Sequence, residues 1–194
     1  TGATPTTAMT VSAAQVVNFA NAPTIGGAAF PSGAMTLIST QTASSSASLA
    51  WTGLSSYSRY FLLIDDMNFS SSSAAIQIGY GSTPTYITSN YRFNANNFNA
   101  GTLQSSTSTT GTGGRFTYSG VSSGPPNGLM GFFILDGFTS TAVSCVGMFN
   151  QLDVNLPGVS GFYVSVGSTP TAIKILAYSG GNISGTASLY GISS

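Results

Sequence analysis

Short apolar stretches with a period of two run through most of this chain, and they constrain its fold more than any other feature. From about Met35 onward, β-branched and aromatic residues recur between clusters of Gly, Ser, Asn and Pro, which is typical of an all-β sandwich or barrel. Alternate side chains of a strand share one face. The clearest sets of this kind are Leu49/Trp51, Ile76/Ile78/Tyr80, Phe162/Val164/Val166 and Ile173/Ile175 with Ala177. The spacing predicts eight to eleven strands. Only residues 10–19 have a spacing that allows two helical turns, and their Val content disfavours a helix.

Two runs are apolar at consecutive positions, so both faces of the strand are apolar. They are residues 60–64 (Tyr-Phe-Leu-Leu-Ile) and residues 129–135 (Leu-Met-Gly-Phe-Phe-Ile-Leu). Strands with two apolar faces are covered on both sides in folded proteins. We therefore expect these two runs to lie at the centre of a sheet or against a partner subunit.

The first 34 residues differ in composition from the rest of the chain. They hold three Pro, a Gly-Gly pair and many Ala, a composition that does not build a core by itself. A chain of 194 residues is long enough for one sizeable core. We expect an irregular arm or linker at residues 1–34 and an antiparallel β-sandwich, of jelly-roll type, at residues 35–194.

Charged residues make up only 4% of the chain, with four Lys plus Arg and four acids. A neutral chain of this kind cannot neutralise several phosphates or attach to an anionic membrane by charge, and no run reaches the roughly 18 apolar residues of a membrane span. We expect neither nucleic-acid binding nor membrane insertion. Low charge also weakens the repulsion that keeps free monomers apart, so we expect a homo-oligomer, most simply a homotrimer, inside a larger assembly.

Side chains that could perform catalysis are scarce. The chain has no His and no Glu, which most acid–base and nucleophilic mechanisms need. Asp65 and Asp66 are expected to form a turn at a strand end. Residues 65–68 also offer oxygen ligands for calcium, but they lack the Asp-rich loop and Glu of a calcium site. The single cysteine, Cys145, is expected to be a small buried core residue. We expect no enzyme activity, no cofactor and no metal.

Two other segments are predicted to connect strands. Residues 81–85 and residues 167–171 share the sequence Gly-Ser-Thr-Pro-Thr, in which Gly and Pro favour a turn. Residues 105–114 contain only Ser, Thr and Gly. We expect two similar turns and a flexible loop or surface ribbon.

Aromatic rings alternate with amides and one Arg between residues 86 and 99. A ring can cover the C–H face of a sugar while amides and a guanidinium bind its hydroxyls. The alternative is a strand with its rings in the core, followed by an Asn-rich turn. In either case Tyr91 and Phe93 share one face, and Arg92 with its Asn neighbours takes the other; we expect the Arg92 face to be exposed. The candidate ligand-binding residues are Tyr86, Asn90, Tyr91, Arg92, Asn94, Asn96 and Asn97.

Two segments resemble phage structural proteins. They are residues 35–44, Met-Thr-Leu-Ile-Ser-Thr-Gln-Thr-Ala-Ser, and the chain end at residues 179–192, which includes Ser-Gly-Thr-Ala-Ser-Leu-Tyr-Gly-Ile. Both are similar to segments of tail-fibre and virion-surface domains, and the resemblance extends from Met35 to Ile192. It implies a β-sandwich, often a jelly roll, association around a three-fold axis, a place on the particle surface beside other virion proteins, and no catalytic residue.

Three functional hypotheses follow from these features. The first is a tail-fibre or receptor-binding tip that recognises host surface polysaccharide. The alternative is a capsid decoration or cement protein that stabilises the shell without binding sugar. A polysaccharide depolymerase is the third and has the least support, because the chain has few acids.

Overall fold

The computed structural model describes residues 35–70, 73–99, 102–117, 128–151, 156–178 and 180–193, together with four short strands nearer the start of the chain. These strands are β1 (Met9–Val11), β2 (Val17–Phe19), β3 (Thr24–Ile25) and β4 (Ala28–Ala29). The chain divides into two units at residues 34 and 35.

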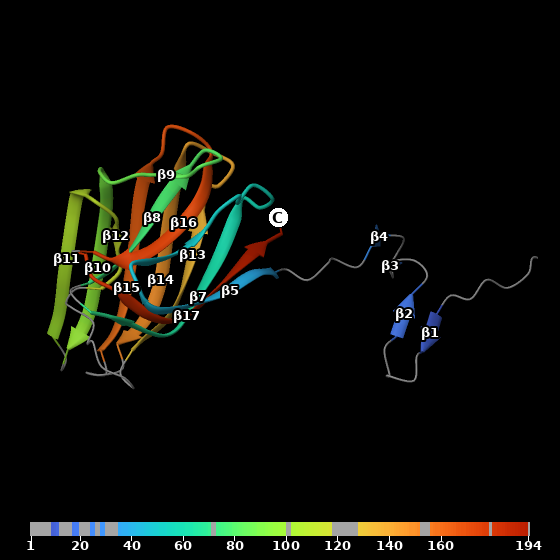
Figure 1. Cartoon of the computed structure of the whole chain (residues 1–194), viewed down its shortest axis with the longest axis horizontal. Helices are drawn as coiled ribbons and strands as arrows, with labels where there is room; N and C mark the ends of the chain where they lie inside the picture. Colours follow the sequence, from blue (N-terminus) through green and yellow to red (C-terminus); the bar gives the residue numbers. More distant parts are fainter. Residues whose placement is uncertain are drawn as a thin grey trace, which may run out of the picture. The chain divides into compact units, whose positions relative to one another are not determined.

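In the first unit, β1 pairs with β2 and β3 pairs with β4, both antiparallel (Figure 1). At both ends of residues 10–19, where the spacing allowed two helical turns but the Val content disfavoured them, the structure has strands. β-branched Val side chains restrict their own rotamers in a helix and fit a strand better, and Val11 and Val17 pair across β1 and β2.

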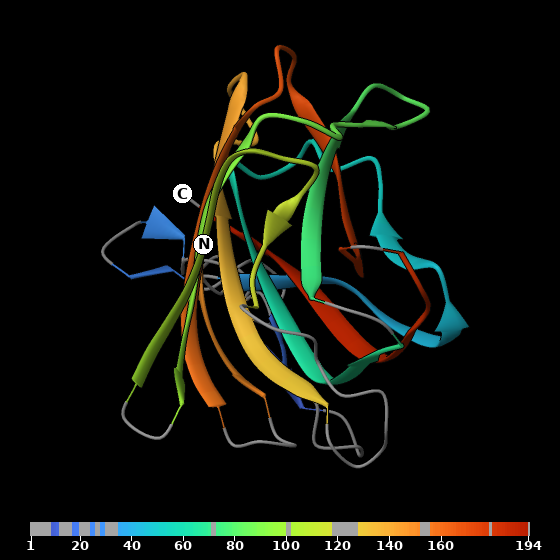
Figure 2. The same ribbon diagram turned by 90° about the vertical axis from the view of Figure 1, so that its left-hand side faces the viewer.

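The second unit is an antiparallel β-sandwich without a helix in the part of the chain that the structure describes (Figure 2), so the predicted fold class is confirmed. Its described residues form thirteen strands, β5 to β17, more than the eight to eleven expected. The larger sheet has the order β11-β10-β15-β14-β13-β7-β17-β5, and the smaller sheet has the order β12-β8-β16-β6, with β9 paired to β8. We call them the large sheet and the small sheet.

The strands of the large sheet are β5 (Met35–Ser46), β7 (Arg59–Phe69), β10 (Tyr91–Asn99), β11 (Thr102–Gly111), β13 (Leu129–Asp136), β14 (Ala142–Gln151), β15 (Leu156–Ser165) and β17 (Ile183–Ile192). The strands of the small sheet are β6 (Ser48–Trp51), β8 (Ala74–Tyr80), β9 (Thr85–Tyr86), β12 (Gly114–Arg115) and β16 (Pro170–Ala177).

The core lies between the two sheets and follows the predicted alternation. Three of the four predicted sets are buried along one face of a strand: those of β6, β15 with Val166, and β16. Strand β8 differs, because it is buried at every position from Ala74 to Gly79. The Gln77 amide donates to the backbone carbonyl of Thr112 at 2.8 Å, and the Tyr86 ring lies against Gly79. The segment around Thr112 and the short strand β9 thus cover the second face of β8.

The two runs with apolar residues on both faces are β7 and β13, which pair with each other inside the large sheet. Their central position confirms the prediction. Leu62 and Phe133 pair across the two strands and are fully buried toward the core. Leu63 and Phe132, the next pair, point to the opposite face and are 40% and 36% exposed.

Asp65 and Asp66 do not end a strand, so the expected turn is wrong. Strand β7 continues to Phe69, and its register with β13 shifts beside these two residues, as at a β-bulge. Asp66 has a positive φ of 48°, and its carboxylate accepts a hydrogen bond from the Gly128 N–H at 3.1 Å. At the bulge, β7 has one residue more than the paired part of β13. This explains why two polar residues interrupt an apolar strand.

The Ser/Thr/Gly tract at residues 105–114 forms a strand as far as Gly111. Residues 102–111 form edge strand β11, which pairs with β10. Thr residues favour strands, and an edge strand whose faces stay exposed needs no apolar alternation.

The two Gly-Ser-Thr-Pro-Thr segments each begin with a glycine of positive φ, Gly81 at 86° and Gly167 at 74°. The hydroxyl of Thr171 donates to the carbonyl of Gly81 at 2.8 Å. The two turns are therefore similar in their first residue and adjacent in space.

Candidate functional site

Strand β10 carries the centre of the predicted site and alternates as expected. Tyr91 and Phe93 point into the core, while Arg92 and Asn94 are exposed on the outer face of the large sheet. The Tyr91 hydroxyl accepts a hydrogen bond from the Ile78 N–H at 2.7 Å. This contact holds Tyr91 in the interior and orients the alternating residues of β10.

The structure brings three of the seven predicted residues together and separates the other four from them. Tyr91 and Asn97 are fully buried, so they cannot contact a ligand at the surface, and this part of the predicted set needs correction. Tyr86 lies in β9 of the other sheet, where the Lys174 ammonium is 4.0 Å from its ring centroid. The group that shares the outer face of the large sheet consists of Arg92, Asn94 and Asn96; Asn90 is exposed just before β10, with a φ of 61°.

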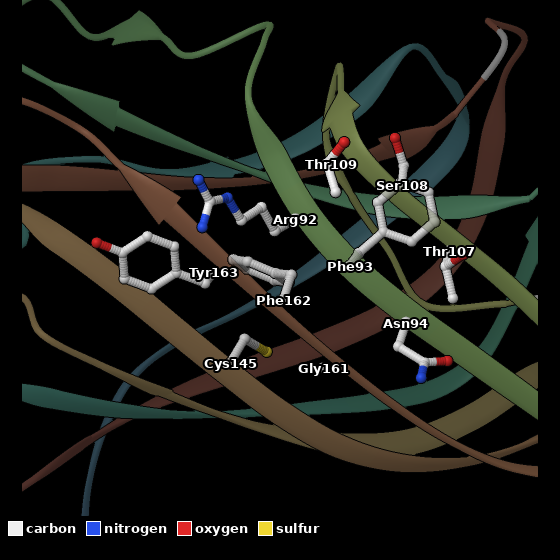
Figure 3. A pocket seen from close by; sticks show the side chains of 10 residues that line it. All are labelled: Arg92, Phe93, Asn94, Thr107, Ser108, Thr109, Cys145, Gly161, Phe162 and Tyr163. Carbon is white, nitrogen blue, oxygen red and sulfur yellow. The ribbon is translucent and has the colours of Figure 1, made fainter.

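A hollow of about 710 Å³ lies beside Arg92 on strands β11, β10, β15 and β14 (Figure 3). Arg92 pairs with Tyr163 of β15, and Asn94 pairs with Gly161. Since Gly161 has no side chain, the space beside Asn94 stays open. A Cβ at Gly161 would lie 2.9 Å from the carbonyl oxygen of Cys145, so the short distance between strands also requires a glycine. We call this site the Arg92 hollow.

The rim of the Arg92 hollow combines one ring with several polar groups. The Tyr163 side chain is 46% exposed and emerges beside Arg92 from the neighbouring strand (Figure 3). Across β10, the hydroxyl-bearing residues Thr107, Ser108 and Thr109 of β11 line the other side. The Asn94 carbonyl accepts a hydrogen bond from Ser105 at 3.4 Å, which leaves its amide N–H groups for a ligand.

Arg92 is the one charged residue among those that line the hollow. Of the three aspartates in the described ranges, Asp65 and Asp66 lie at the bulge of β7, and Asp136 pairs with Arg59 at 3.1 Å. No hydrogen bond or ion pair joins the Arg92 guanidinium to another described residue. The hollow therefore carries a positive charge that no described side chain neutralises.

Tyr163 was not among the predicted site residues, although the sequence contains a signal for it. Phe162, Val164 and Val166 alternate on the buried face, so Tyr163 had to point outward. An aromatic residue on an exposed face is a candidate for binding. The contribution of β11 was not recognised, because that tract was expected to be a flexible loop or surface ribbon and was not paired with β10.

The side chains with catalytic or metal-binding chemistry do not gather at this site. Within the described residues, no group of three or more His, Cys, Asp or Glu could hold a metal ion. Cys145 lies under the hollow and is 7% exposed. Burial raises the pKa of its thiol, which keeps it protonated and unreactive at neutral pH. The arrangement fits binding better than bond cleavage.

No helix in the described part of the chain is long and apolar enough to cross a membrane.

Apolar side chains cover the centre of the same outer face. Leu63, Phe132, Met148 and Val159 form one row across four strands, since each pairs with the next. A second row is formed by Phe61, Ile134 and Val146. Met130 lies beyond the first row on β13. We call these eight residues the apolar band.

Rings of the apolar band pack on each other, but much of the band is open to solvent. The rings of Phe61 and Phe132 stack with centroids 5.6 Å apart, while Val146 and Met148 are 62% and 56% exposed. Val146 pairs with Gly161, so the band reaches the Arg92 hollow. A continuous exposed apolar surface on a sheet commonly marks a site of protein association.

No protein-family model matches this chain, and a comparison with curated proteins finds no match either.

Proposed function

We propose that this chain is a non-enzymatic structural and binding protein of a phage particle, which acts as a tail-fibre or receptor-binding tip and binds host surface glycan in the Arg92 hollow. The observation that carries the proposal is the combination around an open floor: the exposed Tyr163 ring, the Arg92 guanidinium and the Asn94 amide. The ring covers the C–H face of a pyranose, and the guanidinium and amide bind its hydroxyls.

We also propose that the sandwich is a jelly roll with two insertions. Eight strands, taken in chain order, support this topology: β5, β6, β7, β8, β12, β13, β16 and β17. They occupy the orders β5-β17-β7-β13 and β6-β16-β8-β12 in the two sheets, and successive strands pass between sheets at every step except β8 to β12. Eight strands in two sheets with such crossings are the pattern of a jelly roll.

The insertions support the location of the site. Strands β10 and β11 lie between β8 and β12 of the chain, and β14 and β15 lie between β13 and β16. All four add to one side of the large sheet, and the Arg92 hollow is built from these four strands. Binding sites are commonly added to a common scaffold in this way.

The proposal is tested by removing single charges from the surface. Arg92→Ala is expected to weaken binding to capsular polysaccharide and lipopolysaccharide by about 1–3 kcal/mol, the value of a hydrogen bond to a charged group. Arg59→Ala is the matched control, because it removes the same charge from a residue that pairs with Asp136. Binding is measured by calorimetry over a panel of host polysaccharides. Equal affinities of the folded Arg92→Ala protein and the wild type would refute the site.

A depolymerase activity is tested in the same samples. A hydrolase of this kind needs two carboxyl groups around the scissile bond, and none of the described aspartates lines the hollow. We expect no oligosaccharides to be released during prolonged incubation. Their release would replace the binding proposal with an enzymatic one.

The apolar band favours a second candidate function, capsid decoration. In the receptor-binding proposal, other copies of the chain cover the band in a homotrimer; in the alternative, neighbouring virion proteins cover it and the chain binds no sugar. Light scattering of the purified full chain distinguishes the two. A trimer supports the first candidate, and a monomer that binds isolated capsids supports the second.

A further inference from the structure

We propose that the Arg92 hollow selects acidic sugars, and that its ligand carries a carboxylate, as hexuronic and sialic acids do. This inference rests on the proposed glycan-binding function and specifies its ligand. It starts from a comparison of the four cationic side chains, which is the full number of Lys and Arg in the chain.

Three of the four cations have partners within the chain. Arg59 pairs with Asp136 at 3.1 Å. Arg115 donates to a backbone carbonyl at 2.8 Å and to a serine hydroxyl at 3.3 Å. The Lys174 ammonium lies over a tyrosine ring. Arg92 is the exception: its side chain is exposed and makes no hydrogen bond or ion pair with another described residue.

An arginine that has no structural partner, in a chain with so few charges, needs another explanation. The Arg92 guanidinium makes no hydrogen bond or ion pair with a described residue that would stabilise the fold. Its position at a hollow with an aromatic rim places it where a ligand would meet it. The missing partner is then an anion that the ligand supplies.

The shape of the guanidinium indicates which anion. Its N–H donors lie in one plane and match the two oxygens of a carboxylate in a bidentate pair. Arg92 and Asn94 are alternate residues on one face of β10, so their Cα atoms are about 7 Å apart. One sugar ring spans this separation. Its carboxylate can lie on Arg92 while a ring hydroxyl accepts from Asn94.

The remaining groups of the site favour an anion over a neutral sugar. The other polar residues that line the hollow are uncharged, and the exposed Thr107 and Thr109 carry hydroxyls that can donate to oxygen. No described carboxylate lines the hollow to repel an acidic sugar. A neutral sugar would displace water from the Arg92 guanidinium without compensating its charge.

The test uses pairs of ligands that differ in charge alone. The full chain is titrated with oligosaccharides that contain hexuronic or sialic acid, each compared with the same oligosaccharide after reduction of its carboxyl to an alcohol. We expect the acidic form to bind at least about tenfold more tightly, equal to a charge-assisted contact of at least 1.4 kcal/mol. This advantage should decrease as salt rises, because the contact is at an exposed site.

Three variants assign the selectivity to Arg92. Arg92→Gln should bind the acidic and reduced forms equally. Arg92→Lys, which keeps the charge but loses the planar donors, should retain only part of the advantage. Arg59→Gln is the matched control and should retain all of it. Circular dichroism verifies that each variant is folded.

The outcomes separate this inference from the function on which it rests. If the wild type binds acidic and reduced forms equally, the carboxylate is not recognised, while glycan binding stands. If Arg92→Gln keeps the full preference, the inference is also refuted. If no saccharide of either kind binds, the proposed glycan-binding function fails together with the inference.

Discussion

The two faces of the large sheet carry similar residues in their central strands, yet only one face is covered by the chain itself. Phe133 and Leu62 point inward and are fully buried, while their neighbours Phe132 and Leu63 point outward and remain partly exposed. The small sheet covers the inner face. The outer residues therefore gain less from folding of the single chain than the inner ones.

The outer face is itself divided. Its centre, over β7, β13 and β14, is apolar, whereas the side formed by β10 and β11 carries Arg92, Asn94 and hydroxyl groups. Covering an apolar surface with another protein lowers the free energy, because the surface is removed from water. A polar rim around one exposed ring suits a hydrated ligand such as a sugar. We propose that this face combines a surface for assembly with a surface for recognition.

Truncating neighbouring phenylalanines of β13 tests the contrast between the two faces most strongly. Phe133→Ala leaves a cavity beside the Phe116 ring, whose centroid is 4.7 Å from that of Phe133. It should lower the free energy of unfolding by about 3–5 kcal/mol. Phe132→Ala on the outer face should lower it by less than about 1.5 kcal/mol, because part of that ring is already solvated.

Urea denaturation of both variants at a concentration where the protein is monomeric gives the two values. Similar losses for Phe132→Ala and Phe133→Ala would contradict the assignment of inner and outer faces. A loss for Phe132→Ala that appears only at concentrations where the chain associates would instead strengthen the role of the apolar band.

A charge placed in the apolar band tests whether the outer face mediates self-association. Val146→Arg puts an unpaired cation at a site that assembly would bury, and we expect the dissociation constant to rise by about 100-fold, or about 2.7 kcal/mol. Thr107→Arg adds the same charge to the same face, outside the band. Sedimentation velocity measures both. An oligomer of Val146→Arg as stable as that of Thr107→Arg would exclude the band as the interface.

The fold class and the orientation of β10 could be predicted because alternation is a local property. The period-two sets marked the buried faces, and the two doubly apolar runs identified the central strands β7 and β13. Placing Arg92 opposite Phe93 required no knowledge of the neighbouring strands.

The remaining features depend on pairing between distant segments, which one sequence does not encode locally. The bulge at Asp66 exists because β13 sets the register of β7. The Arg92 hollow forms because β10 pairs with β15, which brings Tyr163 beside Arg92. Strand β11 has no buried apolar face, so its polar residues resembled a loop. Asn97 differs from these features, because it shares the inner face of β10 with Tyr91 and Phe93 and its burial follows from local alternation.

Removing one tyrosine hydroxyl from the inner face and one from the outer face of the large sheet tests the same contrast with a smaller expected effect. Tyr91→Phe leaves the Ile78 N–H without the acceptor that it has at 2.7 Å, and an unsatisfied buried donor should lower the free energy of unfolding by about 1–3 kcal/mol. Tyr163→Phe removes a hydroxyl from the exposed rim and should change stability by less than about 0.5 kcal/mol. Thermal or urea unfolding measures the difference. Equal effects would contradict the burial of Tyr91.

Cys145, on the inner face of β14, makes the stability of the fold depend on pH. Burial raises the pKa of this thiol, so the folded state keeps its proton at pH values where the unfolded chain, with a thiol pKa near 8.5, loses it. The folded state then binds more protons than the unfolded state, and stability must fall as pH rises above about 8.5, by at most about 1.4 kcal/mol per pH unit for one group. Below that pH the contribution is fully present.

Cys145→Ala should flatten this decrease between about pH 8.5 and 10. Burial also raises the pKa of Tyr91, so Tyr91→Phe should flatten the decrease only above about pH 10, where an unfolded tyrosine begins to ionise. The chain has no His, which removes the usual titration near neutral pH and gives a level baseline. Urea midpoints at intervals from pH 7 to 11 separate the two contributions. If wild type and Cys145→Ala lose stability with the same slope up to pH 10, the thiol ionises in the folded state, and the inner face of β14 is more open to water than the packing implies.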